Sequence, residues 1–273
     1  MTTVRTQINT ELQRLTNHHF IELTTRGNTA ITAALSLLPK EKTLLIPEEG
    51  GWLSYHNIPK EQHLTIQEVR CNDSAIDIHD LRQKLELGTC SALLYQNPGG
   101  YFAEQPMKEI FTLCKNYNCL VIMDVSGSVG TLLCDGRYAD ILVCSFGKWK
   151  LVDAYTGGFI SCKERVLFEQ LKDVTALVDE EKLTKIYAKL QELPKRISFL
   201  LEKRTKIMKD LTQFPIFHKN TLGFVVVVPF SSETEKENII AYCTTEHLPY
   251  TICPRYIRLN RPAISIEVKQ IVA

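Results

Sequence analysis

The first 165 residues alternate between short apolar runs and segments with apolar residues at helical spacing. The run at 119–125, CLVIMDV, has no polar alternation, which predicts a strand buried on both faces, as in a mainly parallel sheet. The other runs that predict strands are 20–25, 43–47, 64–69, 91–96, 139–146 and 157–162. The segments that predict helices are 1–15, 27–38, 77–87 and 107–118. Strands that alternate with helices in this way predict an α/β fold, a mainly parallel sheet of the seven-stranded type with helices on both faces.

The pattern changes after residue 165. Residues 166–211 are long, charged and helical in spacing, and Pro194 is expected to break or kink that helix. A smaller unit follows, with a strand at 223–230, a helix from 232 and a strand near 263–268. We therefore expect a large domain over 1–165, with the N-terminal helix packed on it. The long helices and a small C-terminal α+β domain would occupy 166–273.

Charge and composition narrow the classes of function. The formal net charge of +1 gives no sign of a nucleic-acid partner or an anionic membrane. The longest apolar stretch, 224–230, is too short to cross a bilayer, and the polar N-terminus does not match a signal peptide. Nine cysteines without a C-x-x-C pair argue against a disulfide framework and against a zinc site. These features predict a cytoplasmic protein with structural cysteines and no bound metal.

Candidate chemistry begins at Asp124, which ends an apolar run in VIMDVSGSVG (121–130). The D-x-S-x-S pattern of von Willebrand A-type domains could hold Mg²⁺, but several strand–helix units precede it here and a glycine-broken segment follows. A nucleophile elbow at Ser128 would lack its first glycine and could take a base only from His218 or His247. The third alternative is that Asp124 faces the positive charge of a cofactor.

A second segment, CSFGKWKLVDAYTGGF (144–159), favours the cofactor. With Asp124, it resembles the corresponding segments of fold-type-I pyridoxal-phosphate enzymes, the aspartate-aminotransferase superfamily, most nearly the DegT-type sugar-aminotransferase branch. The resemblance covers roughly residues 17–162. It implies that Asp124 faces the pyridine nitrogen and keeps it protonated, so that the ring can accept electrons.

The resemblance also implies the lysine that binds the cofactor. In the family, four residues separate a serine from the lysine, and Gly-Gly follows seven and eight residues later. Ser145, Lys150, Gly157 and Gly158 reproduce both spacings. Lys150 would hold pyridoxal 5'-phosphate as an internal aldimine and then move the proton between the substrate and the cofactor. The S-x-x-K spacing of other aminotransferases would select Lys148 instead. Burial beside cations is expected to lower the pKa of the lysine.

Further contacts follow from the resemblance. The phosphate would lie at a helix start, where backbone N–H groups and the helix dipole attract anions. Trp52, or Tyr55 in its place, would stack on the ring, and Asn97 would approach the phenolic oxygen. Arg258, with Arg255 or Arg261 as alternatives, would bind the substrate carboxylate. The residues implied for the phosphate and its surroundings are Gly27, Asn28, Thr29, Ser126, Ser145 and Lys148.

Two departures accompany the resemblance. The sugar-aminotransferase branch has Asp-Ala-Ala-Gln where this chain has Asp124, Val125, Ser126 and Gly127, so a side chain that would contact the cofactor is absent. The C-terminal region is also shorter than in the family.

The resemblance implies an aminotransferase, expected to be a homodimer, that acts on a small amino donor and a keto acceptor, either an amino acid or an amino sugar. The alternatives are a lyase, decarboxylase or desulfurase of the same fold, or an inactive scaffold. A desulfurase would need a reactive cysteine, for which Cys253 is the candidate.

Overall fold

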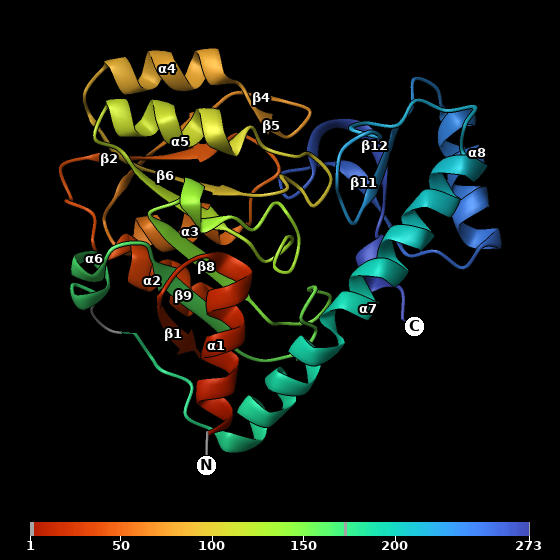
Figure 1. Cartoon of the computed structure of the whole chain (residues 1–273). Coiled ribbons are helices and arrows are strands. Elements are labelled where there is room, and N and C mark those ends of the chain that lie inside the picture. The colour runs from red at the N-terminus through yellow and green to blue at the C-terminus, as the bar shows by residue number, and fades with distance from the viewer. Residues whose placement is uncertain (1–2, 172–173, 273) are drawn as a thin grey trace.

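The structure, a computed structural model, describes residues 3–171 and 174–272 (Figure 1). Its main feature is a seven-stranded sheet of order β1-β9-β8-β7-β6-β2-β3. The strands are β1 (Phe20–Thr24), β2 (Thr43–Pro47), β3 (Thr65–Val69), β6 (Cys90–Gln96), β7 (Leu120–Asp124), β8 (Ile141–Ser145) and β9 (Gly158–Cys162). Strands β3, β2, β6, β7 and β8 run parallel, whereas β9 is antiparallel to both of its neighbours. The predicted α/β class and mainly parallel sheet are confirmed.

Helices cover both faces of this sheet. The alternation of side chains along β7 shows why: Val121 and Met123 belong to one buried cluster, and Ile122 belongs to another on the opposite face. The first cluster is covered by α1 (Val4–Thr16), α4 (Ile78–Glu86), α5 (Met107–Asn116) and α7 (Glu180–Asp210). The second is covered by α2 (Gly27–Leu35), α3 (Ser54–Glu61) and α6 (Arg165–Glu169).

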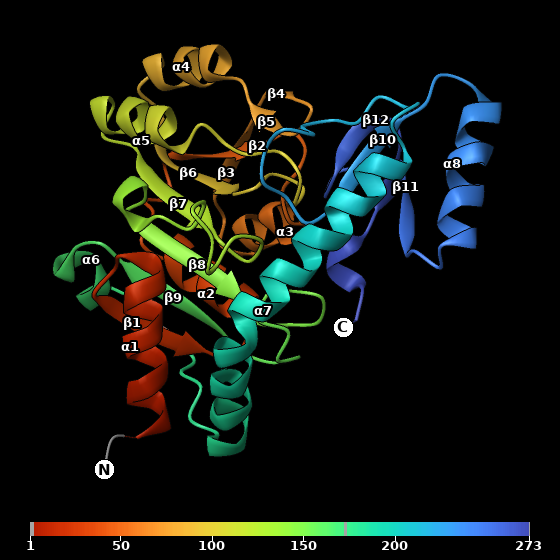
Figure 2. The same cartoon turned by 45° about the vertical axis from the view of Figure 1, so that its right-hand side comes forward.

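The long helix α7 connects the large sheet with a smaller unit (Figure 2). It begins at an Asp179 cap, whose side chain accepts a hydrogen bond from the backbone N–H of Lys182 at 3.1 Å. The helix continues through Pro194, so of the two predicted effects the break does not occur. The smaller unit is an antiparallel sheet of order β10-β12-β11, with α8 against it. Its elements are β10 (Val226–Pro229), α8 (Glu233–Thr245), β11 (Tyr250–Arg255) and β12 (Leu259–Ile266).

Short elements complete the fold. The sequence did not predict α3, β11, or the small hairpin of β4 (Cys71–Asn72) and β5 (Ala75–Ile76). Two 3₁₀ turns, η1 (Gly136–Tyr138) and η2 (Val268–Gln270), follow β7 and β12.

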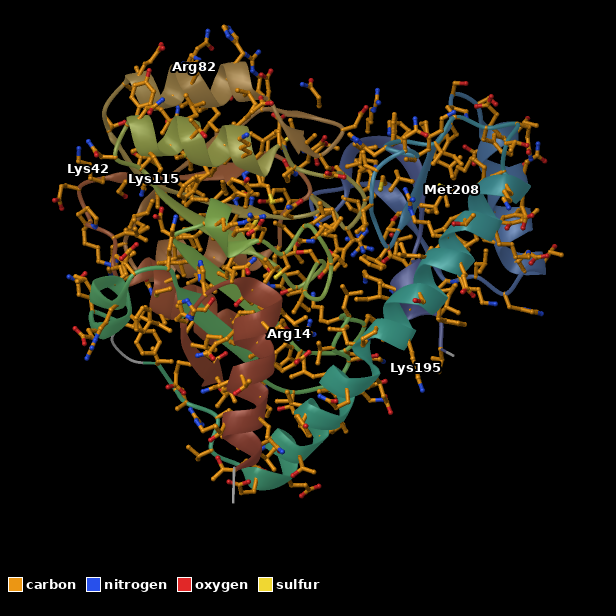
Figure 3. The ribbon with its side chains drawn as sticks, in the orientation of Figure 1. Arg14, Lys42, Arg82, Lys115, Lys195 and Met208 are labelled. Carbon is orange, nitrogen blue, oxygen red and sulfur yellow. The ribbon has the colours of Figure 1, made fainter. Side chains whose placement is uncertain are left out.

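The helices outside the sheet carry charged residues on their outer faces. Figure 3 labels Arg14 on α1, Arg82 on α4 and Lys195 on α7, and all three are exposed. Across residues 3–171 and 174–272, no helix is both long and apolar enough to span a bilayer.

Candidate active site

A cavity of about 820 Å³ lies at the C-terminal ends of β7 and β8 and reaches β11 and η2 of the smaller unit. Clefts at the carboxyl ends of parallel strands are the usual ligand sites of open α/β sheets. The residues predicted for the site line this cavity, except for Thr29 and Asn97. Those that line it are Gly27, Asn28, Trp52, Asp124, Ser126, Ser145, Lys148, Lys150 and Arg258.

Asp124 is the carboxylate at the base of the cavity, where only 5% of the residue is exposed. The Tyr55 hydroxyl donates a hydrogen bond to Asp124 Oδ2 at 2.9 Å. The backbone N–H of Ser126 donates to Oδ1 at 2.9 Å. Tyr55 comes from α3 and is fully buried, so it acts beneath the site and does not stack in the cavity. The carboxylate is therefore held in one orientation from two sides.

Lys150 lies in the loop after β8, and its Nζ donates a hydrogen bond to the Tyr101 hydroxyl. Its amine lies 5.1 Å from the centre of the Tyr101 ring and 5.2 Å from the centre of the Trp52 ring. Burial favours the neutral amine, but Tyr101 and Asp124 favour the ammonium, and the pKa of Lys150 is raised. The expected lowering of this pKa is wrong because the Tyr101 phenol and the Asp124 carboxylate outweigh burial and the smaller effect of Arg258.

Tyr101 was not predicted from the sequence. It is 5% exposed and has a left-handed backbone, with φ of 68°, directly after Gly99 and Gly100. A Cβ added to Gly127 would lie 2.8 Å from the Tyr101 ring. The Tyr101 ring therefore fills the space that a side chain at position 127, where the resembled pattern has glutamine, would need.

Lys148, the alternative lysine, is exposed at the edge of the cavity. Its Nζ lies 4.4 Å from the centre of the Trp149 ring, which is itself 40% exposed. Of the two lysines, Lys150 has the contact with Tyr101 and the electrostatic coupling to Asp124.

The N-terminus of α2 forms another wall. Its cap residue, Arg26, makes no side-chain capping bond, so the first turn of the helix lines the cavity without a capping side chain. A Cβ on Gly27 would lie 2.6 Å from Ser145 Cβ, so this close approach requires glycine. The Trp52 indole donates to Asn28 Oδ1 at 3.0 Å, which fixes the half-buried ring beside the helix start. At the neighbouring strand ends, the backbone N–H of Ser145 donates to Ser126 Oγ at 2.8 Å.

Thr29 and Asn97 lie outside the cavity lining. The Thr29 hydroxyl pairs with the hydroxyl of Thr25 at 3.2 Å. The Asn97 side chain donates to the backbone oxygen of Leu133 at 3.1 Å and accepts from the backbone N–H of Gln105 at 3.1 Å. These bonds hold the turn after β6, so Asn97 shapes the loop that carries Tyr101.

Arg258 lines the cavity but is already engaged by a carboxylate. Its Nη2 lies 2.5 Å from Glu267 Oε2 and its Nε lies 3.1 Å from Glu267 Oε1. Of the two alternatives, Arg261 pairs with Asp73 away from this cavity, whereas Arg255 is exposed and lines it.

The sequence also did not reveal two charged residues in this wall, Glu267 and Lys269. Burial raises the pKa of Glu267, but Arg258 and Lys269 outweigh it and lower the pKa to about 2. Lys269 Nζ lies 3.3 Å from Glu267 Oε2, and burial lowers its pKa to about 8. The sequence pattern that could have revealed these two residues is a Glu-x-Lys pair next to an apolar strand. That pattern is common on protein surfaces and does not by itself indicate burial.

The other chemistries considered from the sequence gain no support from these positions. Among the residues that the structure describes, no group of three or more His, Cys, Asp or Glu is placed to hold a metal ion. Ser128 is fully buried and does not line the cavity. Cys253 lies in β11, is 2% exposed, and burial raises its pKa to about 11, which does not suit a reactive thiol.

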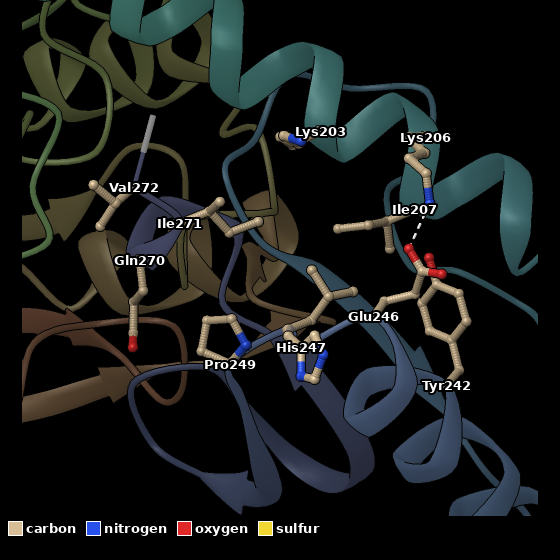
Figure 4. A pocket seen from close by; sticks show the side chains of 11 residues that line it. Lys203, Lys206, Ile207, Tyr242, Glu246, His247, Pro249, Gln270, Ile271 and Val272 are labelled. Carbon is tan, nitrogen blue, oxygen red and sulfur yellow. Dashed lines mark hydrogen bonds and ion pairs between the residues drawn. The ribbon is translucent and has the colours of Figure 1, made fainter.

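A second, smaller cavity of about 310 Å³ lies between α7, α8 and η2 (Figure 4). Lys206 on its edge is paired with Asp210 at 2.8 Å and with Glu246 at 2.7 Å. None of the predicted site residues lines it.

The large cavity fits pyridoxal phosphate by the chemistry of its walls. A helix start without a capping side chain suits a phosphate, and a fixed buried carboxylate suits a protonated pyridine nitrogen. A half-buried indole suits the face of a flat ring, and the Lys150 amine suits an aldehyde.

Comparisons with known proteins agree with this fit. The model of the family described as aminotransferase class I and II matches residues 9–269. A DegT DnrJ EryC1 StrS aminotransferase from Brucella abortus has a similar structure, with a TM-score of 0.80 and 11% identity over 97% of this chain and 84% of that one. A 3-amino-5-hydroxybenzoic acid synthase gives a TM-score of 0.77 and 12% identity over 96% of this chain and 85% of that one. A serine palmitoyltransferase from S. paucimobilis, solved with bound PLP, gives 0.73 and 14% identity over 97% and 71%. No curated protein sequence matches the chain.

Proposed function

Because this chain belongs to the aminotransferase class I and II family, we propose that it is an aminotransferase whose Lys150 binds pyridoxal phosphate covalently. Its substrates would be a small amino donor and a keto acceptor, of the amino-acid or amino-sugar type. The observation that carries the proposal is that Asp124 and Lys150, from the ends of neighbouring strands, line the same cavity.

When bound, the cofactor withdraws electrons from a bond to the substrate carbon next to the amine. Asp124 would support this by holding a proton on the ring nitrogen. Its own orientation is fixed by the Tyr55 hydroxyl and the Ser126 backbone N–H. Lys150 would carry a proton at Nζ whenever its amine is free, and the Tyr101 hydroxyl accepts a hydrogen bond from that amine. Tyr101 would thus keep the free amine inside the cavity.

The phosphate would bind at the start of α2, beside Gly27 and Asn28, with Ser145 opposite. Ser126 would support this end through its bond to the Ser145 backbone. Trp52 would cover one face of the ring, in an orientation fixed by Asn28. Lys148 would contribute positive charge at the exposed edge.

A homodimer is part of the proposal. Apolar side chains at the edge of the cavity are exposed: Leu53 by 50%, Trp149 by 40%, Tyr155 by 60% and Tyr250 by 36%. A second copy of the chain would cover this surface and narrow the cavity mouth. Analytical ultracentrifugation should give twice the mass of the chain, and a monomer would contradict the proposal.

The protein is further proposed to be cytoplasmic. All nine cysteines fall within the described residues and are free thiols, which suits a reducing compartment.

The test of the proposed function is spectroscopic. Purified protein incubated with pyridoxal phosphate should develop the absorption band of a lysine-bound cofactor. Lys150→Ala should abolish that band, and Lys148→Ala should keep it. A band that survives Lys150→Ala and disappears in Lys148→Ala would move the attachment to Lys148. Protein that binds no cofactor would support the inactive scaffold. If cofactor-loaded protein transfers no amino group but eliminates or decarboxylates amino acids, the lyase or decarboxylase is correct.

A further inference from the structure

The cavity wall formed by the residues that flank β12 and by η2 has more positive charge than its own carboxylate can neutralise. Arg258, Glu267 and Lys269 lie together there, and their side chains are 3%, 2% and 8% exposed. Two cations share one carboxylate, so the group keeps a net charge of one positive unit. A buried net charge is costly unless a ligand or a partner neutralises it.

Arg258 makes two of the contacts of the Glu267 carboxylate, whereas the Thr251 hydroxyl, the Ser265 hydroxyl and the Lys269 ammonium make one each. Besides its two bonds to the carboxylate, the guanidinium donates through Nη1 to the backbone oxygen of Ile257 at 2.8 Å and through Nε to Ser265 Oγ at 3.2 Å. The Nε–Nη2 edge of Arg258, which can bind a carboxylate through two parallel bonds, is therefore occupied by Glu267, and Nη1 already donates to the backbone.

Lys269 is the cation of this group with the looser contact, 3.3 Å from Glu267. Its backbone is fixed at both ends: its N–H donates to the backbone oxygen of Phe224 at 3.0 Å, and its oxygen accepts from Arg196 Nη2 at 3.0 Å. The ammonium lies 4.9 Å from the centre of the Tyr101 ring, on which Lys150 also packs. Lys269 thus presents a fixed amine to the same space as the proposed reacting lysine.

We propose that Lys269, and not Arg258, binds the carboxylate of the substrate, and that the substrates are therefore amino acids and keto acids and not neutral amino sugars. This inference rests on the proposed function, because it places the substrate in the same cavity. Arg258 is a positioning residue that holds Glu267, and Glu267 sets the place of the Lys269 ammonium.

The test uses glutarate, a dicarboxylate without an amine, and glutaramide, its neutral counterpart. The chain has two tryptophans, Trp52 and Trp149, and both line the cavity, so tryptophan fluorescence reports on binding there. Lys269→Met should weaken glutarate binding to cofactor-loaded protein about tenfold or more, the loss expected for one charge-assisted contact. Glutaramide binding should not change. Lys195→Met, at an exposed lysine of α7, is the matched control and should bind glutarate as the wild type does.

Three results would overturn the inference. These are unchanged glutarate affinity in Lys269→Met, an equal loss for glutarate and glutaramide, or a larger loss in Arg255→Met than in Lys269→Met. The absorption band of the cofactor, recorded on the same samples, separates this inference from the proposed function. If the band persists and Lys269→Met binds glutarate as the wild type does, only the inference is overturned. A missing band overturns the proposed function, and the glutarate titration of that protein still tests Lys269.

The wild type provides a measurement that does not depend on the folding of a variant. The charged or titratable groups around the Lys269 amine are Glu267, Arg258, Lys150 and Tyr101. Because the pKa of Lys269 is about 8, glutarate affinity should fall as the pH rises through that value. Affinity that stays constant from about pH 7 to 9 would contradict the assignment.

Discussion

Replacement of Lys269 by methionine should increase the stability of the fold while it removes the proposed anion contact. Burial lowers the pKa of this lysine from its ordinary value of 10.5 to about 8. That difference corresponds to about 3 kcal/mol of cost for holding the ammonium in the folded protein near neutral pH, at roughly 1.4 kcal/mol per pKa unit. Methionine has a similar length and no charge, so it removes this cost.

The expected gain is smaller than the full cost. The shift to about 8 is already net of the attraction by Glu267, which keeps both of its bonds to Arg258 in the variant, but repacking around a differently shaped side chain offsets part of the gain. We therefore expect the free energy of unfolding to rise by about 1–2 kcal/mol near pH 7, between zero and the full cost of the buried charge.

The pH dependence provides a separate check on the sign of this change in the free energy of unfolding. The folded-state pKa of Lys269 lies below the unfolded one, so between about pH 8 and 10.5 the unfolded state binds more protons and the wild type gains stability as the pH rises. The difference between variant and wild type should shrink across that window. Tyrosines and cysteines also titrate in this pH range. Because both proteins contain them, their contributions cancel when the stabilities of the two proteins are compared.

Urea unfolding of the cofactor-free proteins, followed by circular dichroism from neutral to alkaline pH, measures this difference. Lys195→Met should match the wild type throughout, because that lysine is exposed. If Lys269→Met is destabilised by about 1 kcal/mol or more near pH 7, or if its difference from the wild type does not shrink with pH, the reasoning about the buried charge is refuted.

Two further predictions concern the tyrosines around the site. Tyr55→Phe removes the hydroxyl that donates to Asp124 and keeps the ring, so cofactor affinity in an absorbance titration should fall about tenfold, and unchanged affinity would show that Asp124 needs no such support. Tyr101→Phe removes a group that raises the pKa of Lys150, so the pH of half-maximal labelling of that lysine by an amine reagent should fall, as located by mass spectrometry. An upward movement of that pH would contradict the role given to Tyr101.

The sequence predicted the large sheet well because its strands are of two kinds. They are either uninterrupted apolar runs or short segments that begin just after a turn. The run 119–125 became β7, whose residues alternate between the two buried clusters. Pro194 does not end α7, which accommodates it within one long helix. The strand β11 was not predicted because it is mostly exposed and has no apolar period.

The half of the site that lies on the large sheet was predictable for a similar reason. Asp124 and Lys150 follow adjacent strands, so their proximity is a consequence of the sheet order. Tyr101 and Lys269 could not be found in this way. Tyr101 reaches Lys150 through a left-handed turn, and Lys269 reaches the Tyr101 ring only because the small sheet folds against the large one. Such contacts depend on tertiary packing, which cannot be predicted from a local sequence pattern.

The two walls of the cavity are synthesised at different times. The last strand of the large sheet ends at Cys162, whereas the opposite wall needs β12 and the bond from Lys269 to Phe224. A chain emerging from the ribosome could complete its central sheet, with Asp124 and Lys150 already at neighbouring strand ends, before any enclosure exists. Capture of the cofactor and selection of the substrate would then be successive events in the maturation of one polypeptide.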